Sequence, residues 1–232
     1  MRKILATLVA LTSVLVAVPA VTGAAASTSQ VYVTHGLPLD TAGTKVDVYV
    51  NGARLIDDFT FGKTAGPLTL PAAKYNVEIR TPDGATALIK KSVTVPGGGN
   101  FSVVASFTDA KGTPGLNVFA NRTLALPSGR ARVALHHAAA APPVDVYLGR
   151  FPSARTNPFL RRKVAAAAPN GAQANLWLRS TKKYLVDVEL PGGPRVLSLD
   201  ALQFPSRSMT NVYVVGSAAG GTLQVITANV KL

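Results

Sequence analysis

The sequence predicts an all-β protein that consists of a signal peptide and two tandem antiparallel β-sandwich domains of immunoglobulin-like or transthyretin-like type. Three observations support this fold class. Short segments alternate apolar with polar residues, the period of a β-strand, and turn residues separate them about every eight to twelve positions. The word Val-Asp-Val-Tyr occurs at residues 46–49 and again at 144–147, each time after a strand-like run that ends in histidine. No segment carries an apolar stripe at helical spacing that is long enough to compete.

The first domain is expected at residues 27–122, and its strands are placed by the turns between them. Asn51-Gly52 is the strongest hairpin signal, because both residues readily adopt the positive φ of a type I′ turn. Pro-Asp-Gly at residues 82–84 and Pro-Gly-Gly-Gly at 96–99 mark two further turns. The expected strands are residues 30–35, 45–50, 53–61, 68–70, 74–79, 87–95, 101–107 and 116–120.

The second domain, residues 131–232, is expected to repeat this order after a linker at 123–130. Matched segments are 74–79 with 183–188, 101–106 with 212–217, and 116–119 with 223–226. The two domains differ most after the repeated word. Where the first domain has its Asn-Gly hairpin, the second has residues 149–163, which are expected to form a basic loop, and the alanine run at 165–168 is also expected to be loop.

The N-terminal stretch, residues 1–26, has the pattern of a secretory signal peptide. Arg2 and Lys3 precede an apolar run at residues 4–18, and the alanines at 24–26 offer a cleavage site before Ser27. No second long apolar run follows, so no transmembrane segment is expected after cleavage. The chain has no cysteine, which excludes disulfides and a lipid-attachment cysteine. We therefore expect a secreted, extracellular protein, either released or associated with the cell envelope.

Charge is the unusual bulk property, because the whole chain carries a formal net charge of +13. Residues 27–127 hold 9 basic and 7 acidic residues, whereas residues 128–232 hold 13 basic and 4 acidic residues. The second domain therefore carries nearly all of the excess positive charge, and an electrostatic role is expected there.

Several motifs together resemble a known family. They are a strand that ends in histidine, then Pro-x-Val-Asp-Val-Tyr, then Leu-Pro-Ala-x-x-Tyr-x-Val and a Val-Val-Ala strand, found at residues 131–147, 70–77 and 101–106. This order resembles the bacterial family called domain of unknown function 4397, as two tandem copies. The resemblance implies exported β-sandwiches without an assigned activity, and it carries over no catalytic residues. Both copies depart from the family pattern in the loop after the histidine, at residues 36–44 and in the alanines at 138–141.

The residues of the repeat allow a structural and a functional interpretation. A histidine at the end of a core-facing stripe serves as a hydrogen-bonded structural residue, or as a ligand or base. Adjacent residues of a strand point to opposite faces of the sheet, so His136 and His137 are not expected to bind one metal ion together. Each aspartate of the repeated word is expected either to accept hydrogen bonds from a turn or a basic residue, or to bind a cation. The acidic pair Asp57-Asp58 lacks the spaced oxygen ligands of a calcium loop. The tyrosine of the later strand is expected to act as a tyrosine corner. The repeat residues are His35, Asp47, Tyr49, Tyr75, His137, Asp145, Tyr147 and Tyr184.

Signatures of catalysis and of cofactor or metal binding are missing from the sequence. Gly216-Ser217 lacks the spacing of a nucleophile elbow, and Gly97-Gly98-Gly99 has no lysine after it for a phosphate. We therefore predict a protein that is not an enzyme and has no cofactor, with an extracellular hydrolase as the remote alternative. Trp177, the single tryptophan, is expected to pack in the core or between the domains, and the alternative is a sugar-stacking platform.

The basic cluster after the second copy of the repeated word is the main candidate site. Clustered cations bind a polyanion, or they form a solvated surface; base reading would need aromatic platforms that this segment lacks. The expected partner is an anionic polymer of the cell envelope or another envelope protein, and no nucleic acid. A binding or scaffolding module is predicted, with a carbohydrate-binding or adhesion module as the alternative. The candidate cations are Arg150, Arg155, Arg161, Arg162, Lys163, Arg179, Lys182 and Lys183.

Overall fold

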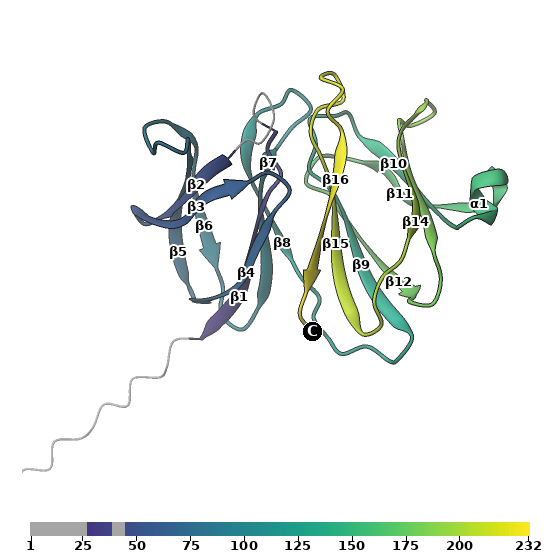
Figure 1. The fold of residues 1–232 in the computed structure, drawn as a ribbon, viewed down its shortest axis with the longest axis horizontal. Coiled ribbons are helices and arrows are strands. Elements are labelled where there is room, and N and C mark those ends of the chain that lie inside the picture. The colour runs from purple at the N-terminus through teal and green to yellow at the C-terminus, as the bar shows by residue number, and fades with distance from the viewer. Residues whose placement is uncertain (1–26, 39–44) are drawn as a thin grey trace, which may run out of the picture.

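The computed structural model describes residues 27–38 and 45–232, and in this part of the chain the protein is all-β, as predicted (Figure 1). The predicted signal peptide lies outside the described residues. The first eight strands are β1 (Thr28–His35), β2 (Lys45–Val50), β3 (Ala53–Thr60), β4 (Thr64–Pro71), β5 (Ala73–Arg80), β6 (Ala87–Val95), β7 (Asn100–Phe107) and β8 (Pro114–Ala120). The next eight are β9 (Arg130–His137), β10 (Val144–Arg150), β11 (Arg161–Ala168), β12 (Gln173–Arg179), β13 (Tyr184–Glu189), β14 (Arg195–Leu202), β15 (Ser208–Val215) and β16 (Gln224–Val230).

These strands form four sheets, which make two sandwiches with the same topology. The first sandwich, β1–β8, has the strand orders β4-β1-β7-β8 and β3-β2-β5-β6. The second sandwich, β9–β16, has the orders β12-β9-β15-β16 and β11-β10-β13-β14, so every strand is matched by the strand eight places later. Within each sandwich one pair is parallel, β1 with β7 and β9 with β15, and the other pairs are antiparallel.

The strand registers correct the predicted alignment of the last two strands. Val31 lies opposite Phe101, and its counterpart Val133 lies opposite Thr210, so Phe101 corresponds to Thr210 and not to Val212. The same two-residue slip affects β8 and β16. A slip of two residues leaves every side chain on the same face of its sheet, so alternation of apolar residues does not reveal it.

The segment after the second copy of the repeated word is not the long loop that the sequence suggested. A one-turn helix α1 (Ser153–Thr156) and a 3₁₀ turn η1 (Pro158–Leu160) lead into the edge strand β11, which contains the alanine run. Ala165 lies opposite Val146 and Ala168 lies opposite Val144 in the β10–β11 ladder. Alanine has no strong strand propensity, and here pairing with β10 decides its conformation.

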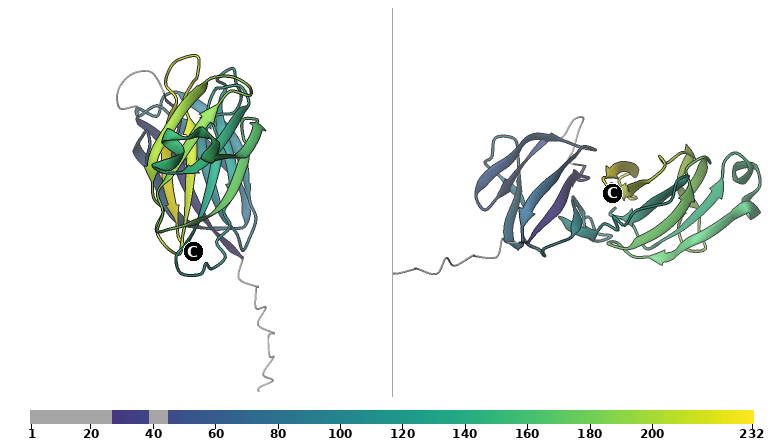
Figure 2. Two further views of the ribbon diagram at one scale, coloured as in Figure 1. Left: turned by 90° about the vertical axis from the view of Figure 1, so that its right-hand side faces the viewer. Right: turned by 90° about the horizontal axis from the view of Figure 1, so that it is seen from below.

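Each sandwich has an apolar core between its own two sheets, and a further apolar layer joins the two sandwiches. Sheet β4-β1-β7-β8 and sheet β12-β9-β15-β16 lie back to back in the middle of the molecule (Figures 1 and 2). Between them, Val104 and Phe119 of the first sandwich pack with Tyr213, Val215 and Ile226 of the second. Nearly all residues of β9 and β15 are buried, because both faces of these strands are covered. No helix of the described residues is long and apolar enough to cross a membrane.

Candidate functional site

The aspartate of the repeated word fixes the edge strand beside it in both sandwiches. Asp47 accepts hydrogen bonds from the Asp58 backbone N–H (3.0 Å) and from Arg54 Nη1 (3.2 Å). Asp145 accepts the equivalent bonds from the Ala167 N–H (2.8 Å) and from Lys163 Nζ (2.6 Å). The bond from Lys163, followed by that from Ala167, lowers the pKa of Asp145. The structure thus gives these carboxylates partners that hold the edge strand.

Asp58 and Ala167 occupy equivalent places and have positive φ angles of 51° and 42°. A residue with positive φ interrupts the regular ladder, and the aspartate binds its N–H at that point. Asp47 also comes together with Asp57 and Asp58, whose oxygen atoms lie within 4.8 Å of one another. Lys45 and Arg54 already pair with this cluster, because Lys45 Nζ lies 2.6 Å from Asp58 and Arg54 Nη1 lies 2.9 Å from Asp57.

The histidines at the ends of β1 and β9 are buried and bond to the backbone that follows them. The Leu37 N–H donates to His35 Nδ1 and the Ala139 N–H donates to His137 Nδ1, both at 3.4 Å. His137 Nε2 lies 3.1 Å from the Pro142 carbonyl oxygen, so it carries the proton and donates. Burial lowers the pKa of His137, and the bond to Pro142 opposes this shift.

The tyrosines of the repeat take two positions. Tyr75 donates its hydroxyl to the Pro71 carbonyl oxygen (2.8 Å), and Tyr184 contacts the Arg179 N–H (2.9 Å) and carbonyl (3.2 Å). Both therefore tie a strand start to backbone four or five residues upstream. Tyr49 and Tyr147 instead lie beneath cations. The Arg80 guanidinium lies 4.7 Å from the Tyr49 ring, and Arg161 and Lys163 lie 5.1 and 5.3 Å from the Tyr147 ring.

Three of the candidate cations are already paired with acids. Arg161 Nη1 lies 2.5 Å from Asp187 and 2.6 Å from Glu189, and its side chain is only 16% exposed. Lys163 pairs with Asp145, and Arg155 lies 3.6 Å from Asp200. No carboxylate of the described residues pairs with the other five, all of which are exposed. They are Arg150, Arg162, Arg179, Lys182 and Lys183.

A groove of about 420 Å³ brings several of the unpaired arginines together at one end of the second sandwich. We call it the arginine groove, and we define it by the four of its arginines that pair with no carboxylate of the described residues and by its two exposed aromatic residues. These residues are Arg130, Arg150, Phe159, Arg162, Trp177 and Arg179. The acid-paired Arg161 and the buried Tyr184 also line it. Arg130 was missed from the sequence, because it begins β9 and lies 20 residues before Arg150 in the chain. The lysines 182 and 183 do not line the groove.

Trp177 is not packed in a core or between the sandwiches, contrary to the expectation. Its side chain is 59% exposed, because β12 is an edge strand, and its ring lies 5.1 Å from the buried Arg132 guanidinium. Phe159, on η1, is 95% exposed. The segment from α1 to β11 therefore does have aromatic rings beside its cations, one of its own and one supplied by β12.

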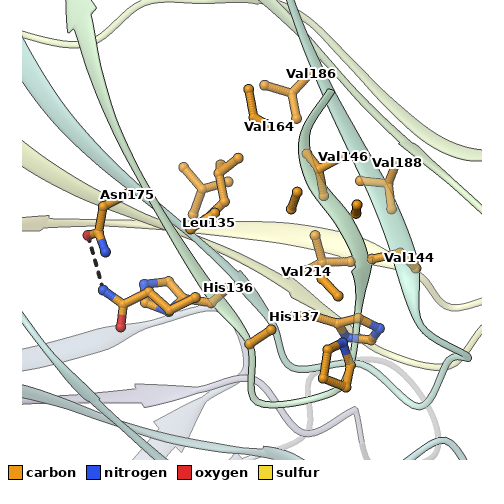
Figure 3. A pocket seen from close by; sticks show the side chains of 18 of the residues that line it. Leu135, His136, His137, Val144, Val146, Val164, Asn175, Val186, Val188 and Val214 are labelled. Atoms are coloured by element: carbon orange, nitrogen blue, oxygen red, sulfur yellow. Dashed lines mark hydrogen bonds between the residues drawn. The ribbon is translucent and has the colours of Figure 1, made fainter. Parts of the chain in front are cut away.

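A second hollow, the apolar cavity, lies between the two sheets of the second sandwich and has a volume of about 470 Å³. Figure 3 shows valine side chains of both sheets around it, among them Val146, Val188 and Val214. His137 lines this cavity, whereas Asp145 faces away from it toward Lys163. The wall also includes exposed residues of β11 and β12, so the cavity reaches the surface between these two edge strands.

Comparison with known families identifies the chain. The model of the family described as Domain of unknown function (DUF4397) matches residues 29–147, just over half of the 232 residues. The chain belongs to this family. The match spans the first sandwich and continues through β9 to the second copy of the repeated word. No curated protein matches the chain.

Solved structures that match this DUF4397 protein share little of its sequence. A family 26 carbohydrate-binding module of Eubacterium rectale, solved with maltoheptaose, is 8% identical, with 88% of this chain and 97% of that chain covered and a TM-score of 0.28. A proposed cell adhesion protein of Bacteroides uniformis is 13% identical, with the same coverage and a TM-score of 0.30. A proposed cell adhesion protein of Bacteroides fragilis is 10% identical, with 90% and 98% covered and a TM-score of 0.23.

Proposed function

We propose that this DUF4397 protein is an exported, non-catalytic binding module that attaches to an acidic polysaccharide of the cell envelope through the arginine groove. One observation carries the proposal. Arg150, Arg162 and Arg179 converge with two exposed aromatic rings on a single groove, and no acid of the described residues neutralises these three arginines. The pattern of a signal peptide at residues 1–26 supports export.

The chemistry of the groove suits a ligand that carries both anionic groups and sugar rings. A guanidinium group is planar and binds carboxylate, sulfate or phosphate oxygens in pairs. Aromatic rings bind the apolar faces of sugar rings. Seven large apolar side chains of the described residues are strongly exposed, and three of them, Phe159, Leu160 and Trp177, line this groove. Such a concentration indicates a contact surface rather than scattered surface residues.

The groups with acid–base chemistry support a non-catalytic role. Both ring nitrogens of His137 are bonded to backbone groups, and Asp145 is bonded to Lys163 and Ala167. A general base needs a lone pair directed at a substrate, whereas the bonds of these groups direct them at other parts of the fold.

The groove is tested with polygalacturonate and heparin as acidic probes and dextran as the neutral one. Replacing Arg150, Arg162 and Arg179 together by serine is expected to weaken binding of the acidic probes roughly 30-fold, since three exposed ionic contacts of about 0.7 kcal/mol each are lost. Isothermal titration calorimetry at several salt concentrations measures the loss, and the salt dependence is expected to become shallower.

A matched control removes three cations from the first sandwich instead. Lys63, Lys74 and Lys111 are exposed and lie away from the groove, so their replacement by serine changes the net charge equally. This control is expected to bind as the native protein does. Equal weakening by both triple variants would show attraction by net charge alone and would refute the groove.

A further inference from the structure

The edge of the second sandwich differs from the edge of the first at the positions that should close the core. The register places Ile56 opposite Val48 and Phe59 opposite Val46 in the first sandwich. In the second sandwich the same positions are Ala165, opposite Val146, and Ala168, opposite Val144. The first sandwich thus closes its edge with two large side chains where the second has two methyl groups.

The size of the hollow between the sheets follows this difference. Phe59 is 7% exposed and belongs to the first core, and Ile56 packs against that core. A hollow between the sheets of the first sandwich has a volume of about 40 Å³, against about 470 Å³ for the cavity in the second. Because natural cores are close-packed, a hollow of the larger size is unusual inside a sandwich, and its volume is of the order found for ligand pockets.

The walls of the apolar cavity select an apolar occupant. Apolar side chains form most of the lining, among them valines 144, 146, 186, 188 and 214 (Figure 3) and the alanines of β11. The polar residues of the lining are His136, His137, Gln173 and Asn175. Gln173 donates a hydrogen bond to Asn175 (3.1 Å), and His137 is already bonded to the backbone. Apolar cavities in protein interiors bind apolar molecules.

A positive charge lies close to the cavity along β11. Arg162 lies opposite Leu148, whose side chain is in the core, so Arg162 lies on the same face of β11 as Ala165 and Ala168. Arg162 belongs to the arginine groove and Val164, two residues later, to the cavity, a separation of about 7 Å along a strand. An unpaired guanidinium therefore lies two residues along β11 from the lining of the apolar cavity.

We propose that the apolar cavity binds the single acyl chain of an anionic amphiphile, such as a fatty acid, whose head group lies at Arg162. The cavity exceeds 300 Å³, within the range of pockets that enclose small molecules. This inference shares Arg162 with the proposed function, but its ligand and its cavity are different.

The test uses the purified protein and a series of saturated fatty acids below their micelle-forming concentrations, with displacement of an environment-sensitive dye as the signal. Affinity is expected to rise about fourfold for each added methylene group until the chain fills the cavity, and then to level off. The alcohol of equal chain length is expected to bind about tenfold more weakly than the acid, and replacing Arg162 by serine removes that preference. No dependence on chain length in the native protein overturns the proposal.

The matched variant rebuilds the closed edge of the first sandwich in the second. Ala165→Ile with Ala168→Phe is expected to abolish acyl-chain binding and to maintain or raise the melting temperature, which shows that the variant is folded. Binding of polygalacturonate is expected to be unchanged, so the experiment distinguishes a failure of the cavity proposal from a failure of the proposed function. A folded double variant that still binds the fatty acids as the native protein does overturns the proposal. So does equal binding of the native and filled proteins to anionic vesicles together with no binding of free fatty acid, because the ligand would then be a membrane surface.

Discussion

Replacing Asp187 by alanine is expected to lower the free energy of unfolding by about 3–5 kcal/mol. Asp187 is fully buried on β13, and it accepts hydrogen bonds from Arg161 Nη1 (2.5 Å) and Ser198 Oγ (2.6 Å). Arg195 lies 3.4 Å from the same carboxylate. Without Asp187, the largely buried Arg161 keeps only Glu189 as a partner, and an under-compensated buried charge is costly.

Urea unfolding at pH 7 measures this loss, and a surface pair provides the control. Asp200 lies 3.6 Å from Arg155 with both side chains at least 40% exposed, so its replacement by alanine is expected to cost under about 1 kcal/mol. Adding Arg161→Met to Asp187→Ala is expected to restore part of the stability, because an apolar side chain needs no counter-charge. A loss at Asp187 no larger than that at Asp200 would contradict a structural role for the Arg161 pair.

The Asp187 pair also explains what the sequence could not reveal about the candidate site. Arg161 and Arg162 are adjacent and have the same chemistry, yet one is held by Asp187 and Glu189 and the other is exposed in the groove. The two acids that bind Arg161 and leave Arg162 unpaired lie on β13, more than 20 residues later in the chain. A count of cations along a segment therefore overstates the number that a ligand can reach.

The two sandwiches were predictable because their signals are local. Alternation with period two and glycine-containing turns fix the strands and the sandwich class, and repetition of the word Val-Asp-Val-Tyr indicates that one topology occurs twice. The edge strand β11 was missed because its alanines have no local preference, and only the bonds to Asp145 and to β10 fix it. The sequence does contain one signal for the apolar layer between the two sandwiches. Residues 212–215, Val-Tyr-Val-Val, form a continuous apolar run, which is typical of a strand covered on both faces.

The layer between the sandwiches contains a buried polar cluster around Asn211. Its Nδ2 group donates to Ser102 (3.1 Å) and to Asn121 (2.9 Å) of the first half of the chain, and its Oδ1 accepts from His136 Nε2 (3.0 Å). Side-chain amides that bond across two packed sheets set the register between them, because a shift leaves buried polar groups without partners. The cluster therefore places a proton on His136 Nε2, and burial of the ring favours its neutral form.

Acidification is expected to weaken this layer through His136. Burial lowers the pKa of His136 from the usual 6.5 to about 4, and the bond to Asn211 opposes the shift only in part. The Tyr213 ring, stacked at 4.7 Å, and the Phe119 ring, at 4.2 Å, face the imidazole, and burial raises the pKa of Tyr213 to about 12. Tyr213 is therefore neutral throughout the acidic range and offers no negative charge to a protonated ring.

The sign of the effect follows from the lowered pKa. Above pH 6.5 the histidine is neutral in the folded and the unfolded chain, and its contribution to stability is complete. As the pH falls from 6.5 through 4, the unfolded chain binds the proton first, and about 3 kcal/mol of stability is lost. Urea unfolding at intervals between pH 7 and pH 4 measures this loss.

A glutamine at position 136 separates this loss from the titration of the acids. His136→Gln keeps a donor for Asn211 but has no proton to gain, so the variant is expected to lose about 3 kcal/mol less than the native protein over the same interval. His137, whose pKa is also lowered by burial, is present in both proteins and cancels in the difference. Parallel pH profiles of the native protein and the variant would show that His136 does not titrate in the layer. A native profile that is steeper by the expected amount would locate the acid sensitivity of the protein between its two sandwiches, far from the arginine groove.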